Sequence, residues 1–330
     1  MLQSNCTAVD PNPDSPCNAA YSSYGFQPAL WTGILFCCLF GIEMIVHCGL
    51  LAYHRLFPRF MFIAIVGAAG ELAGWIARTY GHHDPFDRNG YIAQIICLIL
   101  SPAFISAVNY VALQNVMDVY GSKWSRIPRK WYVLGFCAGD FCSLVVQAVG
   151  GALSAEAETE DAVNLGKSIM IAGVSIQVAV TAPFLLLYLD YNLRRLREWS
   201  KAGIPKHERP YPKVEIFNGV IGISTLFVLI RCIYRIVEMA DGWVGYLATT
   251  EVYFDVLDAL MIVIAIGVFI PFHPGWYLPK DIKRGAMGYN AADMITGEKM
   301  PKTNTELSQE SMAPTATPSA ATSSSDHSPA

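Results

Sequence analysis

Acidic and basic side chains recur at helical spacing in residues 231–261, a stretch that lies between two strongly apolar runs. The first set is Arg231, Arg235 and Glu238, and the second set is Glu251, Asp255 and Asp258. Residues three or four positions apart lie on one helix face, so each set forms a polar stripe. Ionisable groups at membrane depth are costly and usually face a bundle interior or a water-filled cavity. The two stripes therefore predict a ligand-binding site, an ion-pair network that fixes helix packing, or one network that does both.

Polar side chains within other apolar segments are expected to face the same interior. Glu71 and Arg78 lie two helical turns apart and so share a helix face. Further along the chain, Asp140 and Gln147 belong to a stripe of small and polar residues. The glycines of this stripe are Gly139, Gly150 and Gly151. We expect the glycines to let two helices pack closely, and Asp140 and Gln147 to face a ligand or the bundle interior.

The composition indicates lipid as the solvent of these segments. Hydrophobic residues make up 53% of the 330 residues and charged residues only 15%, whereas charged residues reach about 25% in soluble domains. The apolar residues form seven blocks close to the ~20 residues that cross a bilayer. These blocks are residues 28–53, 60–78, 91–116, 131–153, 167–191, 214–237 and 246–270. The sequence therefore predicts an all-α, polytopic integral membrane protein with seven transmembrane helices.

Charge placement predicts the orientation and the division into parts. The first, third and fifth connections and the segment after the last block carry nearly all the Lys and Arg near the spans, and the other side carries Arg88 alone. The positive-inside rule then predicts an extracellular N-terminus and a cytosolic C-terminus. We expect an extracellular leader over residues 1–27, the transmembrane domain over 28–275, and a disordered cytosolic tail over 276–330, which is too poor in large apolar residues to fold.

Two features of the leader agree with this orientation. Asn5 begins an Asn-Cys-Thr sequon, which predicts N-glycosylation on the outside. Cys6 and Cys17 lie in the same segment and can pair in an oxidising compartment, although the sequence leaves open whether they do. The other seven cysteines fall within the apolar blocks without metal-type spacing, so we expect no metal and no cofactor.

The connection over residues 192–213 is strongly basic. Juxtamembrane clusters of Lys and Arg are attracted to the anionic lipids of the inner leaflet. We therefore expect this connection to contact inner-leaflet lipids, in preference to a nucleic acid or a protein partner.

Six short motifs, in order along the chain, resemble those of one family. They are E-x-x-G-W-x-x-R at residues 71–78, L-S-P followed by N-Y within 100–110, G-D-x-x-S with Q and G-G within 139–151, G-x-x-x-Q at 173–177, R-x-x-x-R-x-x-E at 231–238, and H-P-G at 273–275. Over about residues 24–278 the chain resembles the RTA1-like family of fungal seven-span membrane proteins, also called lipid-translocating exporters. It departs from the family pattern at Gln114 and Asn115, where Gly-Arg is usual, and at Asp255, where Tyr is common.

This resemblance implies a plasma-membrane protein that exports, or gives tolerance to, amphipathic molecules such as sphingoid long-chain bases, sterol-like toxins or porphyrins. Acids embedded in the spans outnumber embedded arginines, which suits an amine headgroup, while the aliphatic part of the substrate stays in lipid. The expected ligand-binding residues are Glu71, Arg78, Asp140, Gln147, Arg231, Arg235, Glu238, Glu251, Asp255 and Asp258.

Two other classes of function compete with transport. A seven-helix receptor or sensor of lipid-like ligands fits the number of spans, although the chain has no Asp-Arg-Tyr after its third span and no Asn-Pro-x-x-Tyr in its seventh. A zinc-dependent intramembrane hydrolase requires about three protein ligands, and His47 is the only histidine well inside a span. We therefore expect that the protein is not an enzyme.

Overall fold

The computed structural model describes residues 6, 9–10, 12, 15, 17–22, 24–55, 57–157, 159–203, 211–241 and 245–279. These residues form helices and connections, and they include no strand. Six of the helices are long and apolar enough to cross a membrane. They are α1 (Leu30–His54), α2 (Pro58–His83), α3 (Arg88–Tyr120), α4 (Arg129–Glu156), α5 (Glu160–Lys201) and α6 (Pro212–Asp241). Over the described residues the structure thus confirms an all-α, polytopic architecture, and each of these helices overlaps one of the first six predicted spans.

The expected seventh span, residues 246–270, is not one continuous helix. The chain forms α7 (Tyr246–Thr249), then α8 (Glu251–Phe254), the π-helical segment η3 (Asp255–Leu260) and α9 (Met261–Gly267). Thr250 is extended, with φ −94° and ψ 96°, and separates α7 from α8. A π-helical turn inside a helix often occurs at a functional site, and here it contains Asp255 and Asp258.

Local sequence signals explain several of the helix ends. Asp87 precedes α3, and its carboxylate accepts hydrogen bonds from the backbone N–H groups of Asn89 and Gly90. Thr159 caps α5 in the same way, and side-chain oxygens at this position satisfy amides that lack a partner inside the helix. Pro58 begins α2, where its fixed φ suits the first helical position.

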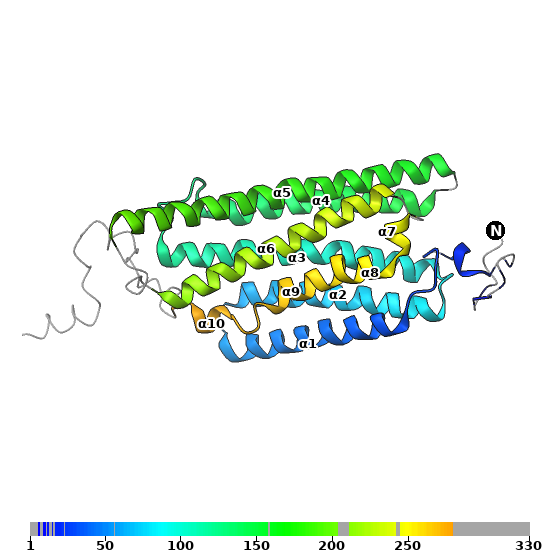
Figure 1. Cartoon of the computed structure of the whole chain (residues 1–330), viewed down its shortest axis with the longest axis horizontal. Helices are drawn as coiled ribbons and strands as arrows, with labels where there is room; N and C mark the ends of the chain where they lie inside the picture. Colours follow the sequence, from blue (N-terminus) through cyan, green and yellow to red (C-terminus); the bar gives the residue numbers. More distant parts are fainter. Residues whose placement is uncertain are drawn as a thin grey trace, which may run out of the picture.

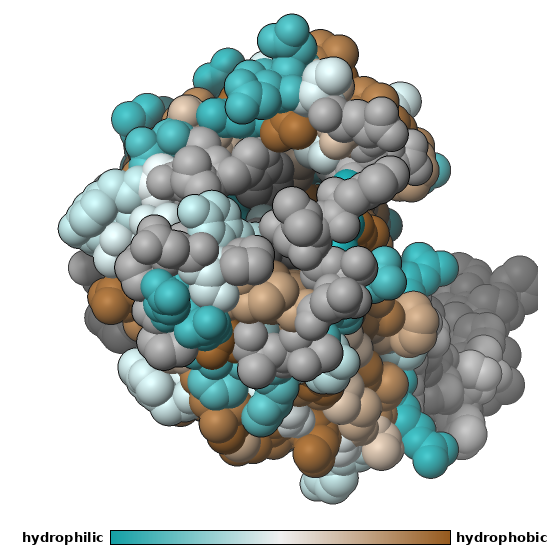
Figure 2. Space-filling view, turned by 90° about the vertical axis from the view of Figure 1, so that its right-hand side faces the viewer, coloured by the Kyte–Doolittle hydropathy of each residue, from teal (hydrophilic) through white to brown (hydrophobic). Residues whose placement is uncertain are grey.

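The long helices lie side by side, and the N-terminal segment and the last described helix lie at opposite ends of the bundle (Figure 1). The leader, with the short 3-10 helix η1 (Ala19–Tyr21), lies at the end that holds α7. From α7 the chain runs back along the bundle, where η3 and α9 contact α6, to α10 (Pro274–Tyr277) at the far end. Hydrophilic side chains gather along the upper edge of the leader end, over α4 and α5 (Figure 2).

The surface of the bundle is apolar, and its interior holds charged groups beside an apolar core. Large apolar side chains such as Ile42, Phe62 and Leu186 are exposed on the outside of the bundle. Charged side chains including Glu71, Arg231 and Asp258 are buried inside it. This distribution fits helices that face lipid, because polar groups in a membrane protein turn toward the bundle interior.

Glycines bring α4 and α5 into backbone contact. A Cβ on Gly150 would lie 2.6 Å from the backbone nitrogen of Met170, and a Cβ on Gly166 would lie 2.6 Å from that of Ser154. Gly139 is similarly close to Val180. The packing role predicted for Gly139 and Gly150 is therefore confirmed, since small residues let two helices approach closely. The same prediction is wrong for Gly151, whose Cβ position meets only Met170 Sδ at 4.0 Å.

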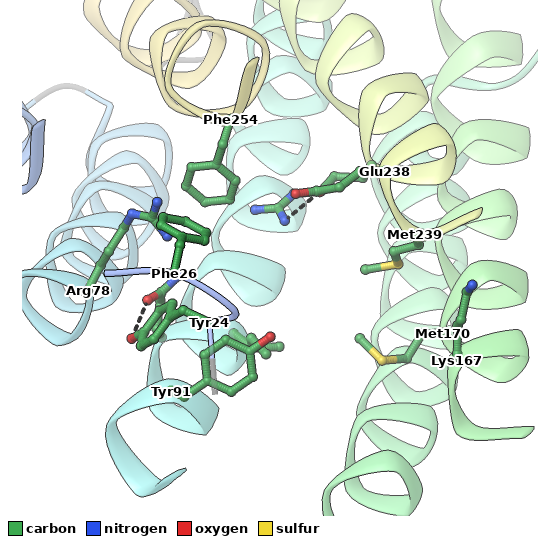
Figure 3. A pocket seen from close by; sticks show the side chains of 12 residues that line it. Tyr24, Phe26, Arg78, Tyr91, Lys167, Met170, Glu238, Met239 and Phe254 are labelled. Atoms are coloured by element: carbon green, nitrogen blue, oxygen red, sulfur yellow. Dashed lines mark hydrogen bonds and ion pairs between the residues drawn. The ribbon is translucent and has the colours of Figure 1, made fainter. Parts of the chain in front are cut away.

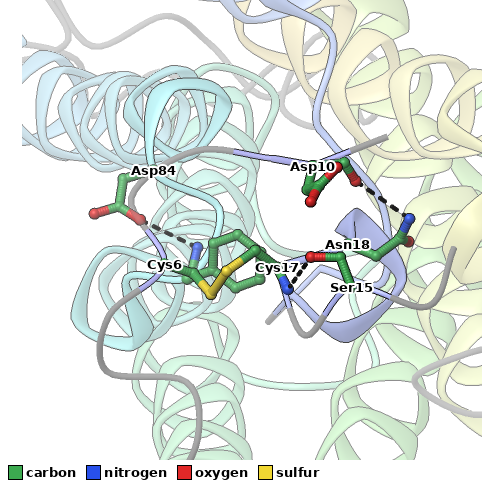
Figure 4. The surroundings of a disulfide bond; sticks show 7 residues. Cys6, Asp10, Ser15, Cys17, Asn18 and Asp84 are labelled. Carbon is green, nitrogen blue, oxygen red and sulfur yellow. Dashed lines mark hydrogen bonds between the residues drawn. A yellow bond between two sulfur atoms is a disulfide. The ribbon is translucent and has the colours of Figure 1, made fainter. Parts of the chain in front are cut away.

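The leader is held by a disulfide bond between Cys6 and Cys17, so the pairing that the sequence left open is present (Figure 4). Asp84, which follows α2, lies beside this disulfide. Further along the leader, Tyr24 contacts α3, because its hydroxyl donates a hydrogen bond of 2.8 Å to Oε1 of Gln94. The predicted glycosylation site, Asn5, lies outside the described residues, as does the tail beyond residue 279.

The basic connection is shorter than its predicted bounds of 192–213. α5 continues to Lys201 and α6 begins at Pro212, so the first ten residues of this range are helical. Arg195 is buried within the bundle, where its guanidinium pairs with Glu215 at 3.1 Å and lies over the ring of Tyr120. At least this arginine therefore faces protein and not the lipid headgroups.

Candidate functional site

The two predicted polar stripes meet in a buried ion-pair network between α6 and η3. Arg235 donates from Nε and Nη2 to the two carboxylate oxygens of Asp258, at 2.7 Å each. Its third nitrogen, Nη1, donates to Glu238 at 2.9 Å. Such fork-shaped contacts between guanidinium and carboxylate are among the strongest hydrogen bonds in proteins. The network fixes the π-helical turn against α6.

Arg231 extends this network toward α2 and α3. Its Nε lies 2.8 Å from Asp258 Oδ1, and its Nη2 donates to the carbonyl oxygen of Leu98 at 2.6 Å. Glu71 is 4.0 Å away and fully buried, and neither of its carboxylate oxygens has a hydrogen-bond partner among the described residues. Asp258 therefore serves two arginines, while Glu71 lies at the edge of the network.

A second ion pair joins three helices at the leader end of the bundle. Arg78 of α2 pairs with Glu251 of α8 at 2.8 Å. Glu251 also accepts hydrogen bonds from the backbone N–H of Ala29, at 2.9 and 3.2 Å. Ala29 is the N-cap residue of α1, so the carboxylate satisfies an amide at the positive end of that helix.

Phe254 connects the two ion-pair systems. The guanidinium carbons of Arg78 and Arg235 lie 4.5 and 4.8 Å from the centre of its ring. A cation over an aromatic face is attracted by the ring quadrupole. Phe254 therefore holds two arginines, from α2 and α6, near one point at the leader end of the bundle.

These groups surround a small cavity of about 90 Å³, which we call the chamber (Figure 3). Its wall consists of Tyr24, Phe26, Arg78, Tyr91, Gln94, Ile95, Lys167, Met170, Arg235, Glu238, Met239 and Phe254. Since one water takes about 30 Å³ in the liquid, the chamber has room for a small polar headgroup and not for a whole lipid. Burial raises the pKa of Tyr24 to about 12, so this hydroxyl keeps its proton at neutral pH.

Three of the residues predicted from sequence line the chamber, namely Arg78, Arg235 and Glu238. Three more lie directly behind the wall as their partners or neighbours: Glu251, Asp258 and Arg231. Gln147 is close to this group, because it shares a narrow pocket with Arg231 and Arg235 and donates a hydrogen bond to Ser143 Oγ at 2.7 Å.

The remaining predicted residues do not line the chamber. Asp140 is buried elsewhere and accepts a hydrogen bond of 2.9 Å from the hydroxyl of Tyr110. Asp255 is buried, and its Oδ1 has no hydrogen-bond partner in the described part of the chain. Glu43, another buried acid within a span, lies against Gly267 of α9. The expected excess of carboxylates is therefore absent from the chamber wall, where Arg78, Arg235 and Lys167 accompany one carboxylate, Glu238.

Sequence reasoning missed the aromatic half of the chamber and one of its cations. Tyr24 and Phe26 belong to the leader. Tyr91 lies in the first turn of α3, and Lys167 lies near the start of α5. Phe254 had a usable signal, because it lies three and four residues from Glu251 and Asp258 and so near the same helix face. The leader aromatics had no such signal, since their contacts are distant in sequence.

The fold and the site define a polytopic helical membrane protein with an ion-paired, aromatic chamber at one end of its bundle. Residues 64–281 match the family model described as RTA1 like protein. The chain therefore belongs to the RTA1-like family, and it is an integral membrane protein.

Two of the curated relatives carry names that refer to a transported molecule. The chain is 33% identical to the sphingoid long-chain base transporter RSB1 of Saccharomyces cerevisiae, over 76% of this chain and 73% of the relative. It is 28% identical to protoporphyrin uptake protein 1 of the same yeast, over 63% and 68% of the two chains. Protein RTM1 of this yeast is 26% identical, over 66% and 70%. No solved structure matches the chain.

Proposed function

We propose that this protein is a membrane transporter or translocator of amphipathic, lipid-like molecules, and that the chamber binds their polar headgroups. The observation that carries the proposal is the chamber itself, a cavity of about 90 Å³ with charged and aromatic walls inside a lipid-facing bundle. Relatives named as a transporter of sphingoid long-chain bases and a protoporphyrin uptake protein support the same class of cargo.

The chamber wall suits a headgroup that combines an amine with hydroxyl groups. Glu238 provides a carboxylate acceptor for the amine, and Tyr24, Phe26 and Phe254 provide the aromatic faces that attract a cation. Hydroxyl oxygens of the same headgroup can accept hydrogen bonds from the guanidinium groups of the wall. Sphingoid bases have this combination of groups, and they are the substrate class that we propose first.

The three basic side chains of the wall favour a second class of cargo. Arg78, Arg235 and Lys167 can bind carboxylates, and porphyrins such as protoporphyrin carry carboxylates on an apolar ring. A sphingoid base would bind the acidic group of the wall through its amine, whereas a porphyrin would bind the basic groups through its carboxylates. The two cargoes therefore respond differently to the loss of Glu238.

The proposed topology has seven crossings, with the N-terminus outside the cell and the C-terminus in the cytosol. The proposed location is the plasma membrane. It is supported by the basic residues of the first, third and fifth connections, and by the location of the leader and α10 at opposite ends of the bundle. The disulfide in the leader also favours an oxidising, extracellular environment. In this orientation the chamber lies near the outer leaflet, and the basic connection lies near the anionic inner leaflet.

The test measures binding and translocation by the purified full-length protein. Binding of sphinganine and of protoporphyrin is measured in lipid nanodiscs, and transbilayer movement of fluorescent analogues is measured in liposomes. We expect Glu238→Gln to weaken sphinganine binding about tenfold or more, because removal of one partner of a buried charge pair costs about 2–5 kcal/mol. Protoporphyrin binding is expected to be retained.

The matched control is Glu198→Gln, which removes an exposed carboxylate whose partner is Lys201 of the same helix. It should leave binding and movement of both probes unchanged. Equal sphinganine affinity in the Glu238→Gln and wild-type proteins overturns the headgroup assignment. Failure of the wild-type protein to bind or move either probe overturns the proposed function.

A further inference from the structure

A much larger apolar groove lies next to the chamber. It has a volume of about 1050 Å³ and runs between α3 on one side and α4 with the first part of α5 on the other. Most of the α3 wall is a stripe of isoleucines on one helix face, and these are Ile92, Ile95, Ile96 and Ile99. Arg88 and Asn89 line the groove where α3 begins. The α4 wall consists mainly of small residues, and these are Ala148, Gly151 and Ala152.

Two adjacent glycines of α4 have different roles in forming this groove. Gly150 packs on α5, where a Cβ would come within 2.6 Å of the backbone nitrogen of Met170. Gly151 points away from that contact, and the nearest atom to its Cβ position is Met170 Sδ at 4.0 Å. Gly150 therefore closes the α4–α5 interface, whereas Gly151 leaves the groove open.

The groove and the chamber adjoin each other. Tyr91, Ile95 and Met170 line both of them. Tyr91 of α3 and Met170 of α5 lie on opposite sides of the space where the chamber opens between these helices (Figure 3). On the groove side, Ile96 is 52% exposed, so the isoleucine wall faces the surrounding lipid. A charged chamber thus adjoins a lipid-facing groove, with wall residues in common.

We propose that this groove binds the hydrocarbon chain of the amphiphile whose headgroup occupies the chamber, so that the substrate enters sideways from the bilayer between α3 and α4. This inference rests on the proposed function and adds to it the route of entry and the specificity-determining wall. The groove extends roughly 12 Å between Ile92 and Leu100, at about 1.5 Å per residue. This length accommodates part of an alkyl chain that lies along α3.

The groove selects by shape, because lipid tails are as apolar as the isoleucines and provide no hydrophobic driving force for transfer out of the bilayer. The small side chains at 148, 151 and 152 provide the free width. Enlarging one of them should therefore exclude long or bulky chains while leaving the headgroup contacts intact.

The test uses sphinganine and homologues with shorter alkyl chains, bound to the full-length protein in nanodiscs. Gly151→Leu places an isobutyl group in the groove, and we expect about tenfold weaker binding of sphinganine, since small changes in an apolar pocket discriminate by about 10–200-fold. The shortest homologue should lose much less affinity. Val149→Phe is the matched control, because Val149 is 50% exposed on the same helix and does not line the groove.

A second variant narrows the groove from the opposite wall, in case Gly151→Leu does not fold. Ile96→Trp enlarges a side chain that is already half exposed, and it should produce the same loss for long chains. If the folded variants keep the chain-length preference of the wild type, the groove assignment is wrong. In that case the wild-type protein still binds the homologues, and the proposed function stands. Absence of binding by the wild-type protein overturns both.

Discussion

Asp258 accepts two hydrogen bonds from Arg235, each at 2.7 Å, and also pairs with Arg231 at 2.8 Å. One carboxylate on the π-helical turn thus pairs with two guanidinium groups of α6, and Glu238 is a second acid beside Arg235. Glu71 is as deeply buried and has the same kind of side chain, yet it lies 4.0 Å from Arg231 and forms no hydrogen bond within the described structure. The two acids are equally buried, so the contribution of each to the stability of the fold depends on its partners.

This difference predicts unequal effects of removing the two charges. Asp258→Asn leaves two buried arginines without their main partner, and we expect it to lower the free energy of unfolding by about 3–5 kcal/mol. Glu71→Gln removes a carboxylate without a hydrogen bond, and its effect should be small. Denaturant unfolding of both variants in mixed micelles tests this, with wild type in parallel. Equal destabilisation would mean that Glu71 is tied into the network more tightly than its distances indicate.

Phe254 predicts a second, more local effect. Phe254→Leu keeps most of the apolar volume but removes the ring that lies under Arg78 and Arg235. Since a desolvated cation–π contact contributes up to about 2 kcal/mol, we expect a loss of stability of this order and weaker binding of sphinganine.

The control for Phe254→Leu is Phe269→Leu. Phe269 is also buried, but its ring contacts are the aromatic rings of Phe60 and Phe217. This variant should reduce stability and leave the affinity of the chamber unchanged. A similar loss of sphinganine affinity in both variants would contradict a specific role for Phe254.

The disulfide of the leader predicts a dependence of the chamber on redox conditions. The leader contributes Tyr24 and Phe26 to the chamber wall, and the bond between Cys6 and Cys17 constrains it. A disulfide contributes about 2–4 kcal/mol by restricting the open chain. Reduction should therefore weaken sphinganine binding by about tenfold, which corresponds to about 1.4 kcal/mol.

The double variant Cys6→Ser/Cys17→Ser separates this effect from other actions of the reductant. It should bind sphinganine as weakly as the reduced wild type, and added dithiothreitol should not change its affinity. Wild-type affinity in this variant would show that the leader keeps its place without the disulfide.

Much of the fold could be predicted from sequence, because a bilayer imposes a simple length and polarity rule. Five of the six long helices contain a whole predicted apolar block, and α1 contains all but the first two residues of its block. The break at Thr250 and the π-helical turn after it could not be predicted in this way. Both lie in a segment with ordinary helical composition, and their geometry depends on packing against α6.

For the candidate site, the sequence predicted which helix face each charged residue occupies, but not which residue it pairs with. Spacing correctly put Arg231, Arg235 and Asp258 in the interior, because each stripe follows from the helical repeat. Spacing cannot tell which acid meets which arginine, and Asp140 pairs with Tyr110 on a different pair of helices. The contact of Tyr24 with Gln94 spans 70 residues of sequence, so no local pattern reveals it.

The adjacent glycines of α4 predict a large difference between two otherwise similar substitutions. Gly150→Ala puts a methyl group within 2.6 Å of the Met170 backbone nitrogen and 2.8 Å of the Gly166 carbonyl oxygen. Because backbone atoms of two packed helices cannot yield separately, α4 and α5 must move apart, and overpacking of this kind costs about 1–3 kcal/mol. Gly151→Ala meets only Met170 Sδ at 4.0 Å, and alanine is favoured over glycine inside a helix by about 1 kcal/mol.

Thermal unfolding in detergent should therefore give a lower midpoint for Gly150→Ala than for wild type, and an equal or higher midpoint for Gly151→Ala. The reverse order would mean that Gly151, and not Gly150, closes the α4–α5 interface, and that the groove is narrower than the structure indicates.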